Sequence, residues 1–437
     1  MNQSISYKNI LTLALPAIIS GISEPLIGST DLILVGKNTA NGIAVVGIGG
    51  SAILSVIWIF SSLLSPISAR VAHLSGSGKI DQLHTLVNYL MKKLLFFSVF
   101  IAFFLFLFSD QIISFYDSPD NQISTTASTY FQIRLIGLPF LLLAVFCFQV
   151  FRGLQNTMIA LVVTLISGSV NLVLDFLLIK GLWLFPEMGV LGAAVASTIS
   201  QIVMAIGSVI YFYRFGLFEI KTRTTIYLRT LFSNSSNLFL RTILLNACIL
   251  IGNRITTQQG GIYIELHTIM ANIFIIIAYF LDGIAHSATA FIGKLNGQKD
   301  FLGIKNVAFK SIVLNTAIAL IFTIIVYFFN ATILSFYSPK EEVLQLFLRE
   351  RTLFLATVFV GSLAFTFDGI YIGLENTAFL RNVLLVATII GYFPMLIISQ
   401  NYTLNGVWVA LFVWIVLRSG IPLIHFLFGK RRKGLTT

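Results

Sequence analysis

The stretch FRGLQNT (151–157) returns about 220 residues later as YIGLENT (371–377), and this recurrence decides how the chain is organised. Two further pairs keep the same offset: IISFYDSP (112–119) with ILSFYSP (333–339), and HLSGSGKID (73–81) with KLNGQKD (294–300). The matches occur in the same order in both halves. The sequence therefore predicts two halves of one architecture, produced by an internal repeat.

The composition between these motifs is that of a membrane protein. Of the 437 residues, 57% are hydrophobic and 10% are charged, whereas a soluble domain has about a quarter of its residues charged. Apolar runs of membrane-spanning length recur along the chain, and no polar segment is long enough for a soluble domain. The first apolar segment is too long for a cleaved signal peptide and lacks a small-residue cleavage site.

The hydropathy pattern predicts twelve transmembrane helices, six in each half. The expected spans are 11–35, 44–70, 88–116, 127–151, 159–181, 189–213, 231–255, 262–290, 306–334, 347–372, 380–400 and 404–429. An even number of spans gives both halves the same orientation, so we expect parallel repeats related by an axis along the membrane normal. The fold class is thus an all-α polytopic membrane protein with two pseudo-symmetric six-helix bundles.

These bundles define the expected domains: an N-terminal lobe (1–213), a cytoplasmic linker (214–230) and a C-terminal lobe with a basic tail (231–437). Most of the 28 Lys and Arg residues lie in the N-terminus, in every second loop and in the tail KRRK (430–433). By the positive-inside rule, both termini are cytoplasmic and the chain crosses the plasma membrane. Because the basic residues lie at helix ends, the net charge of +11 predicts contact with lipid headgroups and not with nucleic acid.

Two such lobes commonly enclose a central cavity and transport by alternating access. Ionisable side chains within the spans are then the candidate functional groups, since each costs roughly 2.5–3.5 kcal/mol on insertion scales and is expected to face the bundle interior. In the first span, Glu24 and Asp31 share one helical stripe with Gly21 and Gly28.

A similar polar stripe runs along the fifth span. Asn171 and Asp175 are four residues apart, so they lie on one face. At about 1.5 Å of rise per residue, Asp31 and Asp175 both lie within roughly 6–8 Å of the outer membrane boundary. We expect this pair to share a proton or a small hard cation, for which carboxylate and amide oxygens are suitable ligands. The alternative is that each acid only hydrogen-bonds to a neighbouring helix.

The second lobe carries different charged groups. Arg241 and Asp282 lie at compatible depths, which predicts a structural ion pair. His286 lies one turn beyond Asp282, so a proton relay is the alternative. Asp368 and Tyr371 are candidate contacts at the inner mouth of the cavity.

Other motifs do not predict cofactor or enzyme chemistry. GSGK (76–79) lacks the Ser or Thr of a phosphate-binding loop and no strand precedes it. No spacing indicates a zinc site, and no Ser-His-Asp set is evident. Cys147 and Cys248 lie in apolar runs and are expected to be reduced core residues. We therefore predict a protein that is not an enzyme and has no cofactor, only a coupling ion.

The chain resembles the multidrug and toxic compound extrusion (MATE) transporters along nearly its whole length, and within them the DinF-like branch. The motifs that carry the family resemblance are LALPAIISGISEPLIGSTDLILVG (13–36), FRGLQNT (151–157), NLVLD (171–175) and GVLGAAVAS (189–197). Those that are similar to the DinF-like branch are LRTILL (240–245), YFLDG (279–283), DGIYIG (368–373) and LRN (380–382).

The resemblance implies a secondary active antiporter, driven by proton or sodium influx, that exports small cationic or amphipathic organic compounds. It implies a first-lobe cation site at Asp31, Asn171 and Asp175, which sodium could occupy, with Ser197 as a further contact. The duplicated halves suggest that a monomer suffices. Two alternatives stay open: a lipid-linked oligosaccharide flippase of the same superfamily, and a non-transporting membrane enzyme or scaffold.

Overall fold

The computed structural model describes residues 5–38, 42–116, 121–218, 228–259, 261–337, 341–398 and 403–428. Every regular element among these residues is a helix. The chain divides into two compact units, which we call the N-terminal unit (Leu15–Leu228) and the C-terminal unit (Met1–Ala14 with Arg229–Thr437). The all-α fold class predicted from the sequence is confirmed.

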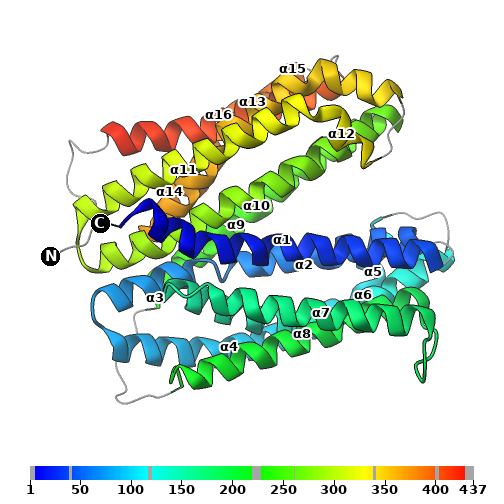
Figure 1. Ribbon diagram of the computed structural model, residues 1–437, viewed down its shortest axis with the longest axis horizontal. Coiled ribbons are helices and arrows are strands. Elements are labelled where there is room, and N and C mark those ends of the chain that lie inside the picture. Colours follow the sequence, from blue (N-terminus) through cyan, green and yellow to red (C-terminus); the bar gives the residue numbers. More distant parts are fainter. Residues whose placement is uncertain are drawn as a thin grey trace. The chain divides into compact units, whose positions relative to one another are not determined.

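The N-terminal unit is built on long helices that pack along their length (Figure 1). Its helices are α1 (Tyr7–Asn38, from Leu15 onward), α2 (Gly42–Ser62), α3 (Pro66–Gly76), α4 (Ile80–Leu107), α5 (Ser109–Ser114), α6 (Asn121–Gly153), α7 (Met158–Lys180) and α8 (Gly189–Arg214). Helix α8 packs against both α6 and α7. The predicted linker begins where α8 ends, and its residues 219–227 lie outside the described part of the chain.

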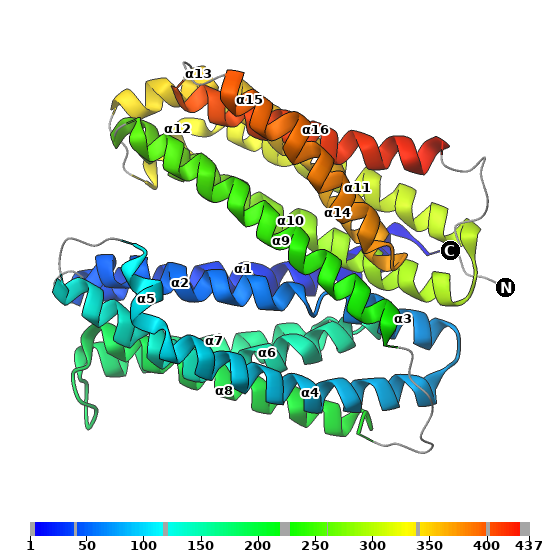
Figure 2. The same ribbon diagram turned by 180° about the vertical axis from the view of Figure 1, so that it is seen from behind.

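The C-terminal unit repeats this order of long and short helices (Figure 2). Its helices are α9 (Arg229–Gln258), α10 (Gly261–Gly297), α11 (Phe301–Phe328), α12 (Asn330–Ser335), α13 (Glu341–Gly373), α14 (Thr377–Val386), the π-helix η1 (Ala387–Tyr392), α15 (Phe393–Ile398) and α16 (Thr403–Phe428). Helix α13 packs against α10, α11 and α16. An apolar core centred on Phe347, Phe354 and Trp408 joins these helices.

Eleven helical segments of the described chain are long and apolar enough to cross a membrane. The described residues Tyr7–Ile22 of α1 add a shorter apolar helix where the first of the twelve predicted spans begins. Helices satisfy their own backbone hydrogen bonds, which is why an apolar chain of this kind is helical in lipid. Helix α4 begins at Ile80 and not at the predicted residue 88, because Leu83, Leu86 and Val87 are buried and extend the helix beyond the apolar run.

The sequence repeat is also a repeat of backbone conformation. Gln155 and Glu375, at equal positions in the two motifs, have φ of 61° and 57°. The next residue closes each turn: the backbone N–H of Asn156 donates to Phe151 (2.8 Å), and that of Asn376 donates to Tyr371 (2.9 Å). The motif thus ends α6 and α13 in the same way, with a left-handed residue after the last turn.

The glycine before each of these turns permits an equivalent close helix contact. A Cβ atom on Gly153 would lie 2.5 Å from the Ser68 carbonyl oxygen of α3. A Cβ atom on Gly373 would lie 3.0 Å from the Thr289 carbonyl oxygen of α10. The two halves therefore share turns and helix contacts as well as sequence motifs.

The first turns of α1 pack within the C-terminal unit. The Ser287 hydroxyl donates to the Ile10 carbonyl (3.0 Å), and the Lys310 ammonium donates to the Ile5 carbonyl (2.6 Å). Lys310 also lies over the Tyr7 ring, 5.6 Å from its centroid. The sequence places residues 5–14 in the N-terminal lobe, whereas these contacts group them with the C-terminal unit.

Candidate functional site

Helix α7 carries a buried polar stripe in the N-terminal unit. Thr164, Ser167, Asn171 and Asp175 follow one another at spacings of three and four residues, and all four are buried. Asn171 is 1% exposed and Asp175 is 0% exposed. Toward the start of α7, the Thr164 hydroxyl lies 3.1 Å from that of Ser20 on α1. Asn171 and Asp175 therefore lie on a helix face that is directed into the unit.

Helix α8 brings a hydroxyl group to the same level. Gly192 lets α8 approach the backbone of Leu178, and Gly207 lets it approach Val163, so the two helices run antiparallel in close contact. Between these two approaches, Ser197 lies at the level of Asn171 and Asp175, and it is also buried. The structure thus places three of the residues named from the sequence at one depth, on two adjacent helices.

The amide of Asn171 is the least satisfied group in this set. Neither its nitrogen nor its oxygen has a hydrogen-bond partner within the part of the chain that the structure describes. A buried amide without a partner costs about 1–3 kcal/mol of stability. A buried amide without a partner calls for an explanation, and one explanation is that a ligand occupies it in another state of the protein.

Two of the residues named from the sequence have side chains outside the described set. Asp31 and Glu24 lie on the helical backbone of α1, but the structure describes neither side chain. The role of Asp31 beside Asp175 stays a prediction. Among the described residues, no group of three or more His, Cys, Asp or Glu side chains is arranged to hold a metal ion.

The side chains around Asn171 define what this site can bind. Carboxylate, amide and hydroxyl oxygens are ligands for hard cations such as sodium, and a buried carboxylate is equally suited to a proton. Lys180 lies more than one turn beyond Asp175 and is directed toward the Phe176 ring, with its ammonium 5.7 Å from the ring centroid. This set therefore has the oxygen chemistry that either a proton site or a hard-cation site requires.

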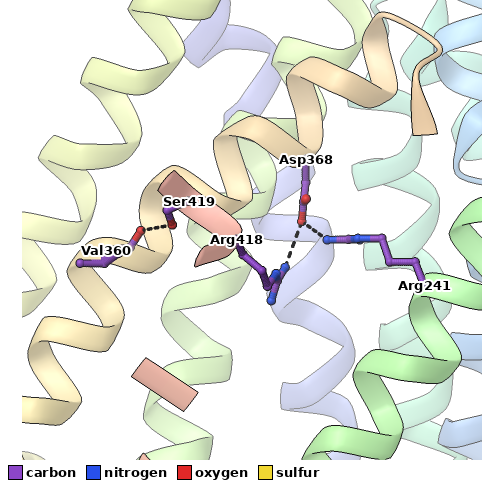
Figure 3. Close-up of polar contacts among 5 residues, drawn as sticks. All are labelled: Arg241, Val360, Asp368, Arg418 and Ser419. Carbon is purple, nitrogen blue, oxygen red and sulfur yellow. Dashed lines mark hydrogen bonds and ion pairs between the residues drawn. The ribbon is translucent and has the colours of Figure 1, made fainter. Parts of the chain in front are cut away.

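The C-terminal unit contains a different charged cluster, drawn in Figure 3. Asp368 on α13 accepts two hydrogen bonds at one oxygen, Oδ2: from Arg241 Nη2 on α9 (2.5 Å) and from Arg418 Nη2 on α16 (3.3 Å). Exposure of the three side chains is 11% for Arg241, 19% for Asp368 and 10% for Arg418. We call these residues the arginine cluster.

Neighbouring contacts hold the arginine cluster in place. The Ser419 hydroxyl donates to the Val360 carbonyl (2.9 Å) and ties α16 to α13 (Figure 3). The Arg418 guanidinium lies over the Trp414 ring, 4.9 Å from its centroid. The Trp414 indole N–H in turn donates to the Thr388 hydroxyl (3.0 Å) in the π-helix η1. Such π-helical turns are frequent at functional sites.

The residues predicted to pair with Arg241 lie on α10. Asp282 and His286 are one turn apart, and both are partly buried. Asp282 is close enough to Arg418 to interact with it electrostatically. The hydrogen-bonded partner of Arg241 is Asp368, a residue that the sequence predicts at the inner mouth of the cavity. An Arg241–Asp282 pair stays a prediction.

Tyr371 lies one turn after Asp368 and is 2% exposed. Its hydroxyl is 2.6 Å from Nδ1 of His425 on α16, and the two rings are in contact. Neither His425 nor Arg418 is among the site residues that the sequence predicts. Arg418 could have been predicted, because an arginine inside an apolar span is a candidate functional group. His425 could not, because only the packing of α13 against α16 brings it to Tyr371.

Comparison with known proteins gives consistent matches along the chain. The family model described as MatE matches residues 16–177 and 238–397. A probable multidrug resistance protein NorM of Thermotoga maritima is 23% identical over 98% of this chain and 93% of its own length. A probable NorM of Photorhabdus laumondii is 26% identical over 97% of this chain and 91% of its own length.

Solved structures share the fold. The crystal structure of a mutant of the Vibrio cholerae MATE transporter VcmN is similar with a TM-score of 0.86 and 14% identity, over 98% of each chain. A MOP superfamily transporter from Pyrococcus furiosus, whose binding pocket is described as having reverse polarity, is similar with a TM-score of 0.84 and 17% identity. That match covers 98% of this chain and 95% of the other.

Proposed function

Because the chain belongs to the MatE family of multidrug efflux transporters, we propose that it is a secondary active antiporter. It exports small organic compounds while protons or sodium ions enter, and the two six-helix lobes alternate access to the two sides of the membrane. The observation that supports coupling is the buried Asn171 amide, which lacks a partner among the described residues and lies one turn from the buried Asp175.

In this proposal, Asp175 and Asp31 bind the coupling cation and Asn171 orients or solvates it. Ser197 lies at the same depth on α8 and supplies a further oxygen. Glu24 is a second candidate contact on the stripe of Asp31. Binding a cation gives the Asn171 oxygen a partner and neutralises a carboxylate, so the bound and free states differ in local electrostatics. That difference is what a coupling site requires.

The substrate class proposed is small cationic or amphipathic compounds. The chain has 40 Phe, 14 Tyr and 4 Trp residues, which supply apolar surface for such ligands as well as for lipid. We place the protein in the plasma membrane, with both termini cytoplasmic on the basis of the basic loops. We expect a monomer on the basis of the duplicated halves. The DinF-like branch remains our proposed placement within the family.

Efflux from proteoliposomes tests the coupling proposal. The purified protein is reconstituted and loaded with ethidium, and efflux is followed under an imposed proton gradient or an imposed sodium gradient. We expect Asp175→Asn to reduce gradient-driven efflux to the level of protein-free liposomes. The amide of this variant is neutral, so it has no negative charge that a bound proton or sodium ion could neutralise. Asn171→Ala is expected to raise the cation concentration needed for half-maximal efflux.

Asp110→Asn provides the matched control. It removes a carboxylate from the same unit, but Asp110 accepts a hydrogen bond from Ser128 near the start of α6, remote in sequence from the α7 stripe. If Asp175→Asn transports as well as Asp110→Asn, the coupling role of Asp175 is excluded. If neither gradient drives efflux of any compound from a substrate panel, the antiporter proposal fails and the flippase alternative is tested with a fluorescent lipid-linked sugar.

A further inference from the structure

The arginine cluster has more positive charge and more hydrogen-bond donors than its partners use. Two guanidinium groups meet one carboxylate, and both bond to the same oxygen of Asp368. The three groups together carry one net positive charge. Each guanidinium has five N–H donors in a planar fork. Within the described residues, the Arg241 side chain and the Arg418 side chain each donate to Asp368 alone.

The uncompensated positive charge and the unused donors of the arginine cluster lie in a largely buried position. Both arginines have about a tenth of their side chain exposed, and their helices α9 and α16 are long and apolar enough to cross a membrane. No nitrogen of Arg241 or Arg418 is among the fully buried side-chain atoms without a partner in the described chain, so the unused donors keep some access from outside the protein. The remaining donors are therefore arranged to receive an acceptor that carries negative charge.

The nearest other carboxylate does not fill this role. Asp282 interacts electrostatically with Arg418, so its negative charge offsets part of the positive charge of the cluster. The other guanidinium donors remain available, because within the described residues Arg241 and Arg418 donate to Asp368 alone. His425, the other titratable group on α16 near the cluster, is held by the Tyr371 hydroxyl (2.6 Å).

Trp414 makes the position suitable for an organic ligand. Its ring covers one face of the Arg418 guanidinium, so the N–H groups along the edge of the guanidinium remain the available donors. Arginine binds carboxylate, sulfonate and phosphate groups through two parallel hydrogen bonds of this edge-on kind. The indole also presents apolar surface next to the charged group, as an amphipathic ligand requires.

We propose that Arg241 and Arg418 form an anion-binding subsite of the C-terminal unit, which takes the carboxylate, sulfonate or phosphate group of an amphipathic organic ligand. Asp368 is the internal competitor: it holds the two guanidinium groups together and is displaced when the ligand binds. This subsite goes beyond the proposed cation coupling, which uses the other unit. Its test measures binding alone, so a failure of export leaves it standing.

The test compares two probes that differ only in one anionic group. Anilinonaphthalene sulfonate and uncharged phenylnaphthylamine are titrated into the full chain in phosphatidylcholine nanodiscs, with empty nanodiscs subtracted. We expect Arg418→Gln to weaken sulfonate binding by about tenfold or more, because a charge-assisted hydrogen bond is lost. Binding of phenylnaphthylamine is expected to change less than about twofold, since it has no anionic group.

Asp368→Asn gives the decisive contrast, because it removes the competitor and leaves both guanidinium groups. We expect it to strengthen sulfonate binding by roughly threefold to tenfold, as the positive charge is no longer compensated. A cluster with only a structural role would instead make both variants bind less, or leave both unchanged. Either of those results overturns the proposal. Arg241→Gln should reproduce the effect of Arg418→Gln and is available if the latter does not fold.

Two controls separate this site from other effects. Arg351→Gln removes one arginine from α13 at its contact with the Tyr327 ring, outside the cluster, and tests whether net charge alone matters. Equal losses in Arg351→Gln and Arg418→Gln would overturn the proposal. Nanodiscs with phosphatidylglycerol distinguish the sources of the anion. If this lipid competes with the sulfonate probe, and the competition disappears in Arg418→Gln, the subsite binds a lipid headgroup. If phosphatidylglycerol leaves the sulfonate affinity unchanged, the subsite binds a soluble ligand.

Discussion

At the scale of the residue, buried amides of the two units differ in how many of their hydrogen bonds are formed within the described chain. Asn315 in α11 is 0% exposed; its amide nitrogen donates to the Leu281 carbonyl (3.2 Å) and to the Thr366 hydroxyl (2.8 Å), whereas its oxygen has no partner among the described residues. Asn171 in α7 is as deeply buried, but has no such partner among the described residues. The first is explained by packing, and the second by the function proposed above, since functional sites retain groups that lower stability.

Substitution by leucine should therefore act in opposite directions at these two positions. Asn171→Leu removes a buried amide without a partner and replaces it with an apolar group of similar size. We expect it to raise the free energy of unfolding by about 1 kcal/mol and to abolish cation-driven efflux. Thermal unfolding in detergent, followed by tryptophan fluorescence, and the proteoliposome assay measure the two effects.

Asn315→Leu is the matched control for this substitution. It removes two hydrogen bonds and leaves the Leu281 carbonyl and the Thr366 hydroxyl without their partner, so it should lower the free energy of unfolding by about 1–3 kcal/mol. A loss of stability in Asn171→Leu comparable to that in Asn315→Leu would show that the Asn171 amide is satisfied in the folded protein, and would remove the main support for its coupling role.

At the scale of the element, glycines set the distances between helices. A Cβ atom on Gly192 would lie 2.8 Å from the carbonyl carbon and oxygen of Leu178, which are backbone atoms of α7. Backbone cannot move aside as a flexible side chain can. The contact that brings Ser197 to the level of Asn171 and Asp175 therefore depends on the absence of a side chain at one position near the start of α8.

We expect Gly192→Ala to lower the free energy of unfolding by about 1–3 kcal/mol, because α8 must move away from α7. Efflux should fall as well, since Ser197 is displaced from the cation site. Unfolding in detergent and the proteoliposome assay provide the measurements.

Gly420→Ala is the control, since a Cβ atom there meets nothing within 4 Å in α16. It should stabilise the helix by up to about 1 kcal/mol through helix propensity. If the two variants are equally stable, α7 and α8 do not depend on this close approach.

At the scale of the whole molecule, α1 belongs to both units. Its first turns are held in the C-terminal unit by Ser287 and Lys310, whereas Ser20 bonds to Thr164 of the N-terminal unit. Pro16 lies between these contacts in the sequence and lacks the backbone donor of a regular helical residue. The helix that carries Asp31 is thus anchored at its start to the unit that holds the arginine cluster.

Lys310→Met should loosen this anchor. Loss of the hydrogen bond to the Ile5 carbonyl is expected to speed hydrogen exchange of the amides of residues 10–14 roughly fivefold, corresponding to about 1 kcal/mol. Mass spectrometry of the protein in nanodiscs measures this exchange. Lys305→Met, on the same helix, is the control, because no hydrogen bond or ring contact of Lys305 occurs within the described chain. Equal exchange in the two variants would contradict the anchoring role of Lys310.

Much of this protein was predictable from its sequence. The lipid environment allows only helices for apolar runs of this length, so the all-helical fold followed from hydropathy. The repeat followed from motifs whose turns, at Gln155 and Glu375, have the same conformation. The polar stripe of α7 followed from helical periodicity, and the structure places Asn171 and Asp175 on a buried face.

What only the tertiary structure decided is which helices lie beside one another. Depth along a span can be read from the sequence, and depth alone predicts that Arg241 pairs with Asp282. The hydrogen-bonded partner is Asp368 from α13, with Arg418 of α16 on the same oxygen, because the lateral order of helices brings α9, α13 and α16 together. Periodicity predicts which face of a helix is buried, and hydropathy predicts the depth of each residue along the span. Neither predicts which helices are neighbours, because that depends on packing along the whole length of each unit.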